Sequence, residues 1–370
     1  MGSRPTFDIA DIVRNHRPAL EASHRLSTPQ RRVLTAISRC RTAALGGHVE
    51  VCEHGDYERI AYNSCRNRHC PKCQALAQEK WITARSERLL DVGHFHTVFT
   101  LPMELRGLAM RHPAEVYQAL LQGTSETLLV LGRTRLKATL GITLVLHTWT
   151  RELAFHPHVH ALVTAGGLAL DGSRFIATRS AFLFPVVMMG VVFRARMLHA
   201  LGALRKRGAF PEWTDQGYAA LASRVARKPW IVYAKKPFKR SRHILAYLGR
   251  YTHRVGIANS RLLEVTRDRV TFRTKLGRTA TLHPVEFLRR LLRHVLPQGF
   301  HKIRHTGLYA STRPGGQLER ARAALGKPQR KRREGPAQKL ERATRTCPVC
   351  GGILRRLPLT STRAPPPTTP

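Results

Sequence analysis

The alternation of apolar and polar positions along the chain predicts a mixture of helices and strands. Apolar residues recur at helical spacing in five segments, which are 1–39, 75–90, 113–132, 191–208 and 284–295. Runs of β-branched and aromatic residues bounded by Gly or Pro predict strands over 94–101, 141–153, 158–168 and 229–238. A further hairpin is expected over 261–275, with its turn near Asp268. The segments 141–153 and 158–168 follow each other closely, so we expect them to be neighbouring antiparallel strands.

The composition changes along the 370 residues and predicts three consecutive parts. Residues 1–92 hold short helices and most of the cysteines, and 93–326 hold the strongest strand and helix patterns. Residues 327–370 are rich in Lys, Arg, Pro and Thr, which predicts a basic, largely disordered tail around a Cys347-Pro-Val-Cys350 pair.

The charge balance indicates a polyanionic partner. The chain has 63 Lys and Arg against 23 Asp and Glu, a formal net charge of +40. Such a charge repels itself in a compact fold, and nucleic acid neutralises it best because basic groups release counterions from phosphates. Ribosomal and structural DNA-binding proteins share this balance, so it does not by itself identify a function.

The apolar stretches favour a cytoplasmic protein with no membrane span. The N-terminal residues lack the apolar core of a secretory signal. The longest apolar run, Ala181–Phe193, is short for a span and contains Pro185. We therefore expect it to be buried structure, in a protein of the cytoplasm.

A cluster of cysteines near the N-terminus predicts a structural zinc site. Five of the seven cysteines lie between Cys40 and Cys73, and Cys70-Pro-Lys-Cys73 has the spacing of a zinc knuckle. Reduced structural cysteines are the alternative. The second pair of ligands is expected from Cys52 with either Cys65 or His54. Cys347 and Cys350 offer two thiolates whose role stays open: completing a site with Cys40, binding zinc across a dimer, or none.

Two residue pairs suggest phosphodiester chemistry. His158 and His160 are two apart on a predicted strand, so they point to one face and can hold a divalent metal. Tyr247 and Tyr251 are four apart on a predicted helix and share a face. A metal beside a hydroxyl nucleophile can cleave DNA through a covalent phosphotyrosine. Taken separately, each pair is more often explained by packing.

The order of motifs resembles the two-tyrosine HUH transposases of the insertion-sequence-91 family from about residue 8 to about 325. The motifs are AISRCRTAALGGHVEVC, YNSCRNRHCPKCQ, HTVFTLP, LHTWTRELAFHPHVHALVTAGGL, WIVYAKKPF, YLGRYTHRVGIANSRL and EFLRRLLRHVLPQGFHKIRHTGL. The resemblance implies an α+β fold in which a small zinc-binding domain precedes a catalytic domain with a central antiparallel sheet flanked by helices. It also implies rolling-circle-like mobilisation of a DNA element.

The resemblance also implies roles for individual residues. His158 and His160 match ligands of a catalytic Mg²⁺ or Mn²⁺, and Tyr247 and Tyr251 match the nucleophiles that form a 5′-phosphotyrosine without ATP. The family's zinc-domain cysteines are matched by Cys40, Cys52, Cys65, Cys70 and Cys73. A third catalytic ligand is expected, with His156, Glu152 and residues beside Tyr251 as candidates.

Basic residues near the nucleophiles are expected to hold the phosphates of single-stranded element ends and target DNA. They are Lys235, Lys236, Arg250, His253 and Arg254. For any one of them a solvated basic face is an equal alternative. The pattern leaves oligomerisation open.

Two departures from the family pattern bear on activity. Gly55 stands where the family pattern has a cysteine, and the stretch Arg273–Leu282 is short. The alternative reading is therefore a catalytically inactive DNA-binding protein or repressor derived from such a transposase. A zinc-ribbon RNA factor does not explain the tyrosine pair.

Overall fold

The computed structural model describes residues 6–178, 183–238, 249, 256–310, 313, 315–326 and 346–359. The fold is mixed α+β, with a central antiparallel sheet flanked by helices, as expected. The chain forms two compact units, one of 1–83, 253–295 and 333–370 and the other of 84–252 and 296–332. We refer to them as the zinc unit and the sheet unit.

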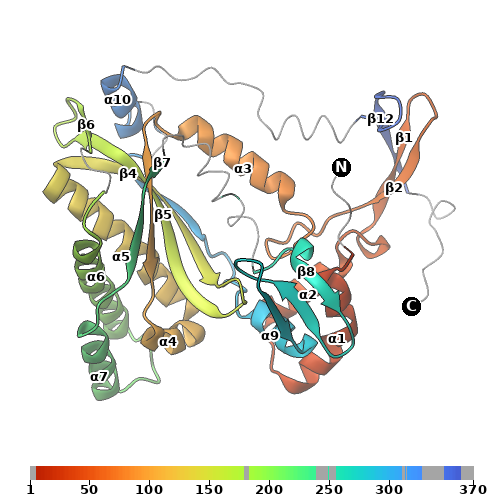
Figure 1. Ribbon diagram of the computed structural model, residues 1–370, viewed down its shortest axis with the longest axis horizontal. Coiled ribbons are helices and arrows are strands. Elements are labelled where there is room, and N and C mark those ends of the chain that lie inside the picture. Colours follow the sequence, from red (N-terminus) through yellow and green to blue (C-terminus); the bar gives the residue numbers. More distant parts are fainter. Residues whose placement is uncertain are drawn as a thin grey trace. The chain divides into compact units, whose positions relative to one another are not determined.

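The sheet unit is built on a six-stranded antiparallel sheet with strand order β11–β4–β5–β3–β7, and β6 pairs with β5 (Figure 1). The strands are β3 (His94–Thr100), β4 (Ala138–Trp149), β5 (Phe155–Ala169), β6 (Phe175–Ala177), β7 (Val232–Phe238) and β11 (Ile303–Gly307). The long strands β4 and β5 are the neighbouring antiparallel pair expected from the sequence.

Helices cover one face of this sheet, where α5 and α6 lie side by side (Figure 1). The helices of the unit are η2 (Met103–Leu105), α4 (Arg106–Arg111), α5 (Pro113–Leu131), α6 (Val186–Lys206), α7 (Asp215–Ala226), α10 (Gln317–Ala324) and the π-helical turn η3 (Gly132–Leu136). Pro113 starts α5 at a position where its missing N–H costs nothing. By length and composition alone α6 could cross a membrane. The burial expected for the apolar run holds only in part: Met189 and Phe193 pack into the core, whereas Val186, Val187 and Val191 are exposed.

The alternation along the strands sends apolar side chains towards the helices and polar ones to the opposite face. Phe95 and Phe99 of β3, Leu144 of β4, and Val159 and Val163 of β5 belong to the main hydrophobic core. The residues between them point the other way, because successive side chains in a strand alternate between faces. The histidines of β3, β4 and β5 therefore gather on the face away from the core.

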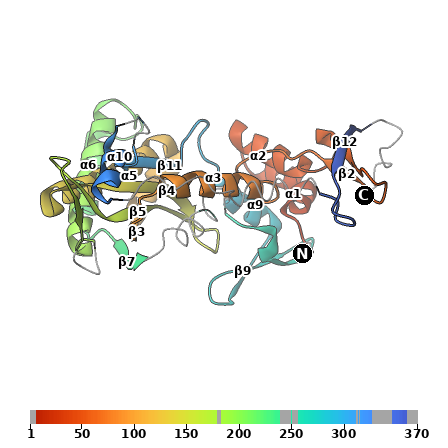
Figure 2. The same ribbon diagram turned by 90° about the horizontal axis from the view of Figure 1, so that it is seen from above.

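The zinc unit contains helices and two small sheets, including one of order β12–β1–β2 (Figure 2). Its elements are α1 (Ile9–Ser23), α2 (Thr28–Arg39), η1 (Ala43–Leu45), β1 (Gly47–Cys52), β2 (Glu58–Tyr62), η4 (Asn259–Arg261), β8 (Leu262–Val265), β9 (Val270–Arg273), β10 (Thr279–Leu282), α9 (Pro284–Leu292) and β12 (Leu354–Pro358). The helix α3 (Ala75–Arg88) contains the boundary between the units. The hairpin expected near Asp268 is β8–β9, and β10 extends it.

The chain is therefore not divided into the three consecutive parts that the composition suggested. Residues 256–295 belong with the N-terminus rather than with 93–252, because α9 packs on α1. Residues 346–359 of the expected disordered tail are folded, because β12 pairs with β1 from His48↔Pro358 to Cys52↔Leu354. Composition indicates neither contact, since both join segments more than 200 residues apart.

Candidate active site and metal centres

Four histidines meet on the core-free face of the sheet, and three adjacent strands supply them. In the antiparallel registers His147 of β4 lies opposite His158 of β5, and Val98 of β3 lies opposite His160. His96 is two residues before Val98 on β3, so it shares that face. The sheet thus places His96, His147, His158 and His160 together without any contribution from loops.

Three of these imidazoles are close enough to share one metal ion. Ligand nitrogens of His147, His158 and His160 all lie within 4.8 Å of one another, and the three residues are buried. The Nε2 atoms of His158 and His160 are 3.1 Å apart. Two nitrogens at about 2.1 Å from a common ion have roughly this separation, so the pair has the spacing of two metal ligands.

Hydrogen bonds fix how two of the rings present their nitrogens. Nδ1 of His158 is 2.6 Å from the backbone oxygen of His156. A carbonyl only accepts, so Nδ1–H donates, and Nε2 of the neutral ring keeps its lone pair. Nε2 of His96 is 2.8 Å from Nδ1 of His160, and the two rings stack with 3° between their planes. His96 therefore orients His160 from behind, as outer-shell partners of metal ligands do.

Burial keeps these imidazoles neutral. It lowers the pKa of His158 to about 4 and that of His96 to about 4. Burial also lowers the pKa of His147 and of His160 well below the ordinary histidine value, and the neighbouring histidines add to the effect. A neutral imidazole has a lone pair to offer, so the site is in the protonation state that metal binding requires.

Two lysines place positive charge at the same face. Lys235 of β7 lies opposite His96 in the register, is exposed, and contributes to the lowered pKa of His96 after burial. The Nζ atom of Lys302 is 5.8 Å from the ring centroid of Trp149, which stacks on His147. Lys302 is buried, whereas Lys235 presents its charge to solvent beside the histidine group.

The third imidazole of this group is His147, which was not among the candidates predicted from the sequence. Two of the predicted candidates lie elsewhere: the ring of His156 accepts a hydrogen bond from Arg106 at 2.7 Å, and Glu152 is exposed between β4 and β5. The candidates beside Tyr251 lie outside the described residues. The sequence feature that could have identified His147 is the short connection between β4 and β5, because it makes the two strands pair with His147 opposite His158. A donor set of three imidazoles fits Mn²⁺ better than Mg²⁺, which prefers oxygen ligands.

The other predicted residues of this site are only partly described. Tyr247, Tyr251, Arg250, His253 and Arg254 lie outside the described residues. Lys236 lies in β7 next to Lys235. The segment with the tyrosines follows β7 directly in the chain, and β7 pairs with β3, one strand away from the strand that carries His158 and His160.

A second centre consists of four cysteines in the zinc unit. Thiol groups of Cys40, Cys65, Cys70 and Cys73 all lie within 4.8 Å of one another. The Sγ atoms of Cys65 and Cys73 are 3.7 Å apart. Thiolates bound to one zinc at about 2.3 Å have roughly this separation. Hydrogen bonds from the other thiols, that of Cys40 first, lower the pKa of Cys73 and favour its thiolate.

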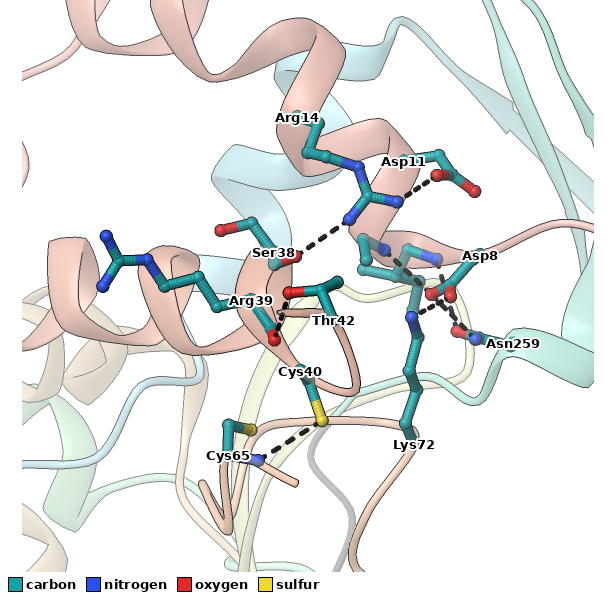
Figure 3. A network of polar contacts seen from close by, with 12 residues as sticks. Asp8, Asp11, Arg14, Ser38, Arg39, Cys40, Thr42, Cys65, Lys72 and Asn259 are labelled. Atoms are coloured by element: carbon teal, nitrogen blue, oxygen red, sulfur yellow. Dashed lines mark hydrogen bonds and ion pairs between the residues drawn. The ribbon is translucent and has the colours of Figure 1, made fainter. Parts of the chain in front are cut away.

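The composition of this centre corrects the expected ligand set. Cys40, at the end of α2, occupies the position expected for Cys52 or His54 and accepts a hydrogen bond from the backbone N–H of Cys65 at 3.5 Å (Figure 3). Cys52 and His54 lie instead beside Cys350, at 3.3 and 3.4 Å from its Sγ. Spacing along the chain could not separate these choices, because the partner of Cys52 is almost 300 residues away.

Contacts around the knuckle tie it to the first helix. Lys72, inside the Cys70–Cys73 turn, forms an ion pair with Asp8 (Figure 3). Asp8 caps α1 by accepting from the N–H of Ala10 at 2.9 Å and also accepts from Nδ2 of Asn259 at 2.9 Å. Lys72 therefore links the Cys70–Cys73 turn to the start of α1.

Comparison with known proteins gives consistent matches. A family described as "Putative transposase" matches residues 141–315, and one described as "Transposase zinc-binding domain" matches 12–101. "Putative transposase y4qJ" of Sinorhizobium fredii is 39% identical over 368 residues, 93% of this chain and 92% of the relative. "Transposase for insertion sequence element IS801" of Pseudomonas savastanoi pv. phaseolicola is 28% identical over 313 residues, 79% of this chain and 73% of the relative. No solved structure matches.

Proposed function

The chain belongs to the insertion-sequence-91 family of transposases, and we propose that it nicks and rejoins single-stranded DNA through a 5′-phosphotyrosine in rolling-circle-like transposition. The observation that carries this proposal is the set of His147, His158 and His160, whose ligand nitrogens lie within 4.8 Å of one another. DNA binding alone does not require three neutral imidazoles in this arrangement, so the arrangement favours the active enzyme over an inactive DNA-binding derivative.

The three histidines would hold Mn²⁺ or Mg²⁺, with the donor set favouring Mn²⁺. When bound, such an ion supplies positive charge that polarises a scissile phosphate. His96 keeps the ring of His160 in place, and the backbone oxygen of His156 does the same for His158. The exposed Lys235 adds charge that attracts the DNA backbone to this face.

Tyr247 and Tyr251 are the proposed nucleophiles. The phenol oxygen attacks phosphorus as its proton leaves, and the bond to the 3′ oxygen breaks as that oxygen gains a proton. One phosphodiester replaces another, so the phosphotyrosine keeps the bond energy and no ATP is needed. A free 3′-OH later reverses the step, which rejoins the strand. A second tyrosine allows one strand to be held while another is cut.

The β3–β7 and β3–β5 registers support the proposal that the tyrosines can approach the histidine group. β7 ends at Phe238, opposite His94, and His94 is four residues along β3 from Val98, the partner of His160. Four strand residues span about 13 Å. Tyr247 follows Phe238 by nine residues, and a chain of that length reaches up to about 30 Å. The tyrosines can therefore return to the histidine face.

The basic residues of the chain indicate what kind of substrate it binds. The net charge of +40 would let the protein follow a phosphate backbone. Lys235, Lys236, Arg250, His253 and Arg254 are the proposed contacts near the nucleophiles. We propose single-stranded element ends and target DNA as substrates, a cytoplasmic site of action at the nucleoid, and oligomerisation as a way to bring two ends together.

The test is adduct formation on single-stranded oligonucleotides that tile both strands of the DNA flanking the gene. With Mn²⁺, a 3′-labelled oligonucleotide should give an adduct that survives denaturation, and a 5′-labelled one should give a free shortened strand. His158→Ala and His160→Ala should abolish the adduct and leave gel-shift affinity largely unchanged. Tight binding by wild-type protein without any adduct would favour the repressor.

A further inference from the structure

We propose a second structural zinc site in the zinc unit, formed by Cys52 and His54 with Cys347 and Cys350. It is separate from the cluster of Cys40, Cys65, Cys70 and Cys73, and it joins the N-terminal hairpin to the C-terminal ribbon. It does not depend on the proposed catalytic function.

The geometry brings soft ligands from both ends of the chain to one point. Sγ of Cys52 is 3.3 Å from Sγ of Cys350, and Nδ1 of His54 is 3.4 Å from the same sulfur. These three ligand atoms lie within 4.8 Å of one another. Cys347 is buried and packs with Cys52 and Leu354 in a small cluster. Three sulfurs and one nitrogen form a common donor set for structural zinc.

The backbone around Cys347 and Cys350 is folded as a zinc knuckle. The N–H of Val349 donates to Sγ of Cys347 at 3.4 Å, and the N–H of Gly352 donates to Sγ of Cys350 at 3.4 Å. The turn closes through Gly351, whose φ of +76° is available to glycine at low cost. Amide donors stabilise thiolates, the form that binds metal.

The two halves of the site are held in register by a sheet. Cys52 pairs with Leu354 at the end of the β1–β12 ladder. Just beyond it, the N–H of Glu53 donates to the oxygen of Ile353 at 3.1 Å, and the carboxylate of Glu53 accepts from the N–H of Ile353 at 2.7 Å. A short three-stranded sheet has little core of its own, so a metal that crosslinks it would contribute directly to its folding.

The site also explains the departure at Gly55. His54 stands one residue before the position where the family pattern has a cysteine, and its ring points to the Cys350 sulfur. Asp56 also has an oxygen within the 4.8 Å group, but a carboxylate competes poorly for zinc with the buried thiolate of Cys347. We therefore assign the fourth position to Cys347 rather than to Asp56.

Metal analysis of the reduced full-length protein tests the assignment. Wild-type protein should hold about two zinc ions per chain, and the double variant Cys347→Ser/Cys350→Ser should hold about one. Asp56→Asn is the matched control and should keep both ions, whereas His54→Ala should lose the second ion to a chelator at least about tenfold faster. One zinc in wild-type protein, or two in the double variant, would overturn the assignment.

A measurement on unaltered protein covers the case in which the variants fail to fold. Cadmium-113 exchanged into wild-type protein should give two NMR signals, one from four sulfurs and one from three sulfurs and a nitrogen. A single four-sulfur signal would refute the second site. A disulfide between Cys52 and Cys350 would do so as well, and mass analysis after alkylation under non-reducing conditions detects it.

Discussion

His147 of β4 lies directly opposite His158 of β5 in the antiparallel ladder, and their ring centroids are 5.4 Å apart. Directly opposed residues share a face of the sheet. The pair His158 and His160 supplies two nitrogens from one strand, and this register adds a third from its neighbour. The sheet itself, rather than a loop, therefore defines the candidate catalytic metal site.

We predict that His147→Ala reduces Mn²⁺-dependent cleavage as strongly as His158→Ala, by at least about 100-fold, because each removes one of three nitrogen ligands. Cleavage of labelled oligonucleotides and gel shifts on the same preparation measure it. DNA affinity should stay nearly unchanged, because it rests on distributed phosphate contacts.

His156→Ala is the matched control for this variant. Its ring accepts a hydrogen bond from Arg106, and the hydrogen bond to Nδ1 of His158 comes from its backbone oxygen, which the substitution keeps, so cleavage should stay within a few-fold of wild type. If His147→Ala cleaves like wild type while His156→Ala does not, the ligand assignment is wrong.

His96 should act on affinity for the metal rather than on the chemical step. His96→Leu removes the partner of Nδ1 of His160, and losing an outer-shell partner costs about 10–100-fold in metal affinity. The Mn²⁺ concentration for half-maximal cleavage should rise accordingly, and excess Mn²⁺ should restore most of the rate. A rate loss that Mn²⁺ does not rescue would assign His96 a different role.

The lowered pKa values predict a pH dependence with a definite sign. A histidine that is harder to protonate in the folded state stabilises the fold fully above its ordinary pKa of 6.5, and this stability is lost as the pH falls towards about 4. Thermal stability without added Mn²⁺ should therefore decline from pH 7 to pH 5. NMR of ¹³C-histidine-labelled protein should show His158 and His96 still neutral at pH 5, and titration centred near 6.5 would contradict this.

Local sequence patterns were sufficient to predict many of the helices and strands of this fold. Pro113 marks the start of α5, and residue spacing two apart places His158 and His160 on one face. Predicting His147 as the third candidate ligand requires the register between β4 and β5, and the connection between the strands sets that register. The sequence contains that information, because 147 and 158 flank a short turn, yet no single-strand pattern reveals it.

Contacts between residues far apart in the chain could not be predicted from local sequence patterns. Cys52 was expected to join the Cys70–Cys73 knuckle together with Cys65 or His54, and only the folded chain shows that Cys40 and Cys65 join it whereas Cys52 faces Cys350. In the same way, α9 packs on α1 from more than 250 residues away. Such choices depend on tertiary packing, which overrides spacing along the chain.

The two tyrosines should be separable in function. Phe keeps the ring and removes only the nucleophilic oxygen, so Tyr247→Phe and Tyr251→Phe should impair cleavage to different extents and should both impair complete transposition. Only one hydroxyl is in line with a given phosphate at a time. Wild-type mobilisation by either single variant would contradict a two-nucleophile mechanism.

The covalent adduct tests the central claim most directly. Wild-type protein is incubated with Mn²⁺ and a cleavable single-stranded oligonucleotide, digested with protease and nuclease, and the modified peptide is identified by mass spectrometry. The account predicts a 5′-linked nucleotide on Tyr247 or Tyr251, and no adduct from Tyr247→Phe/Tyr251→Phe. An adduct on another residue, or one that persists in this double variant, would contradict it.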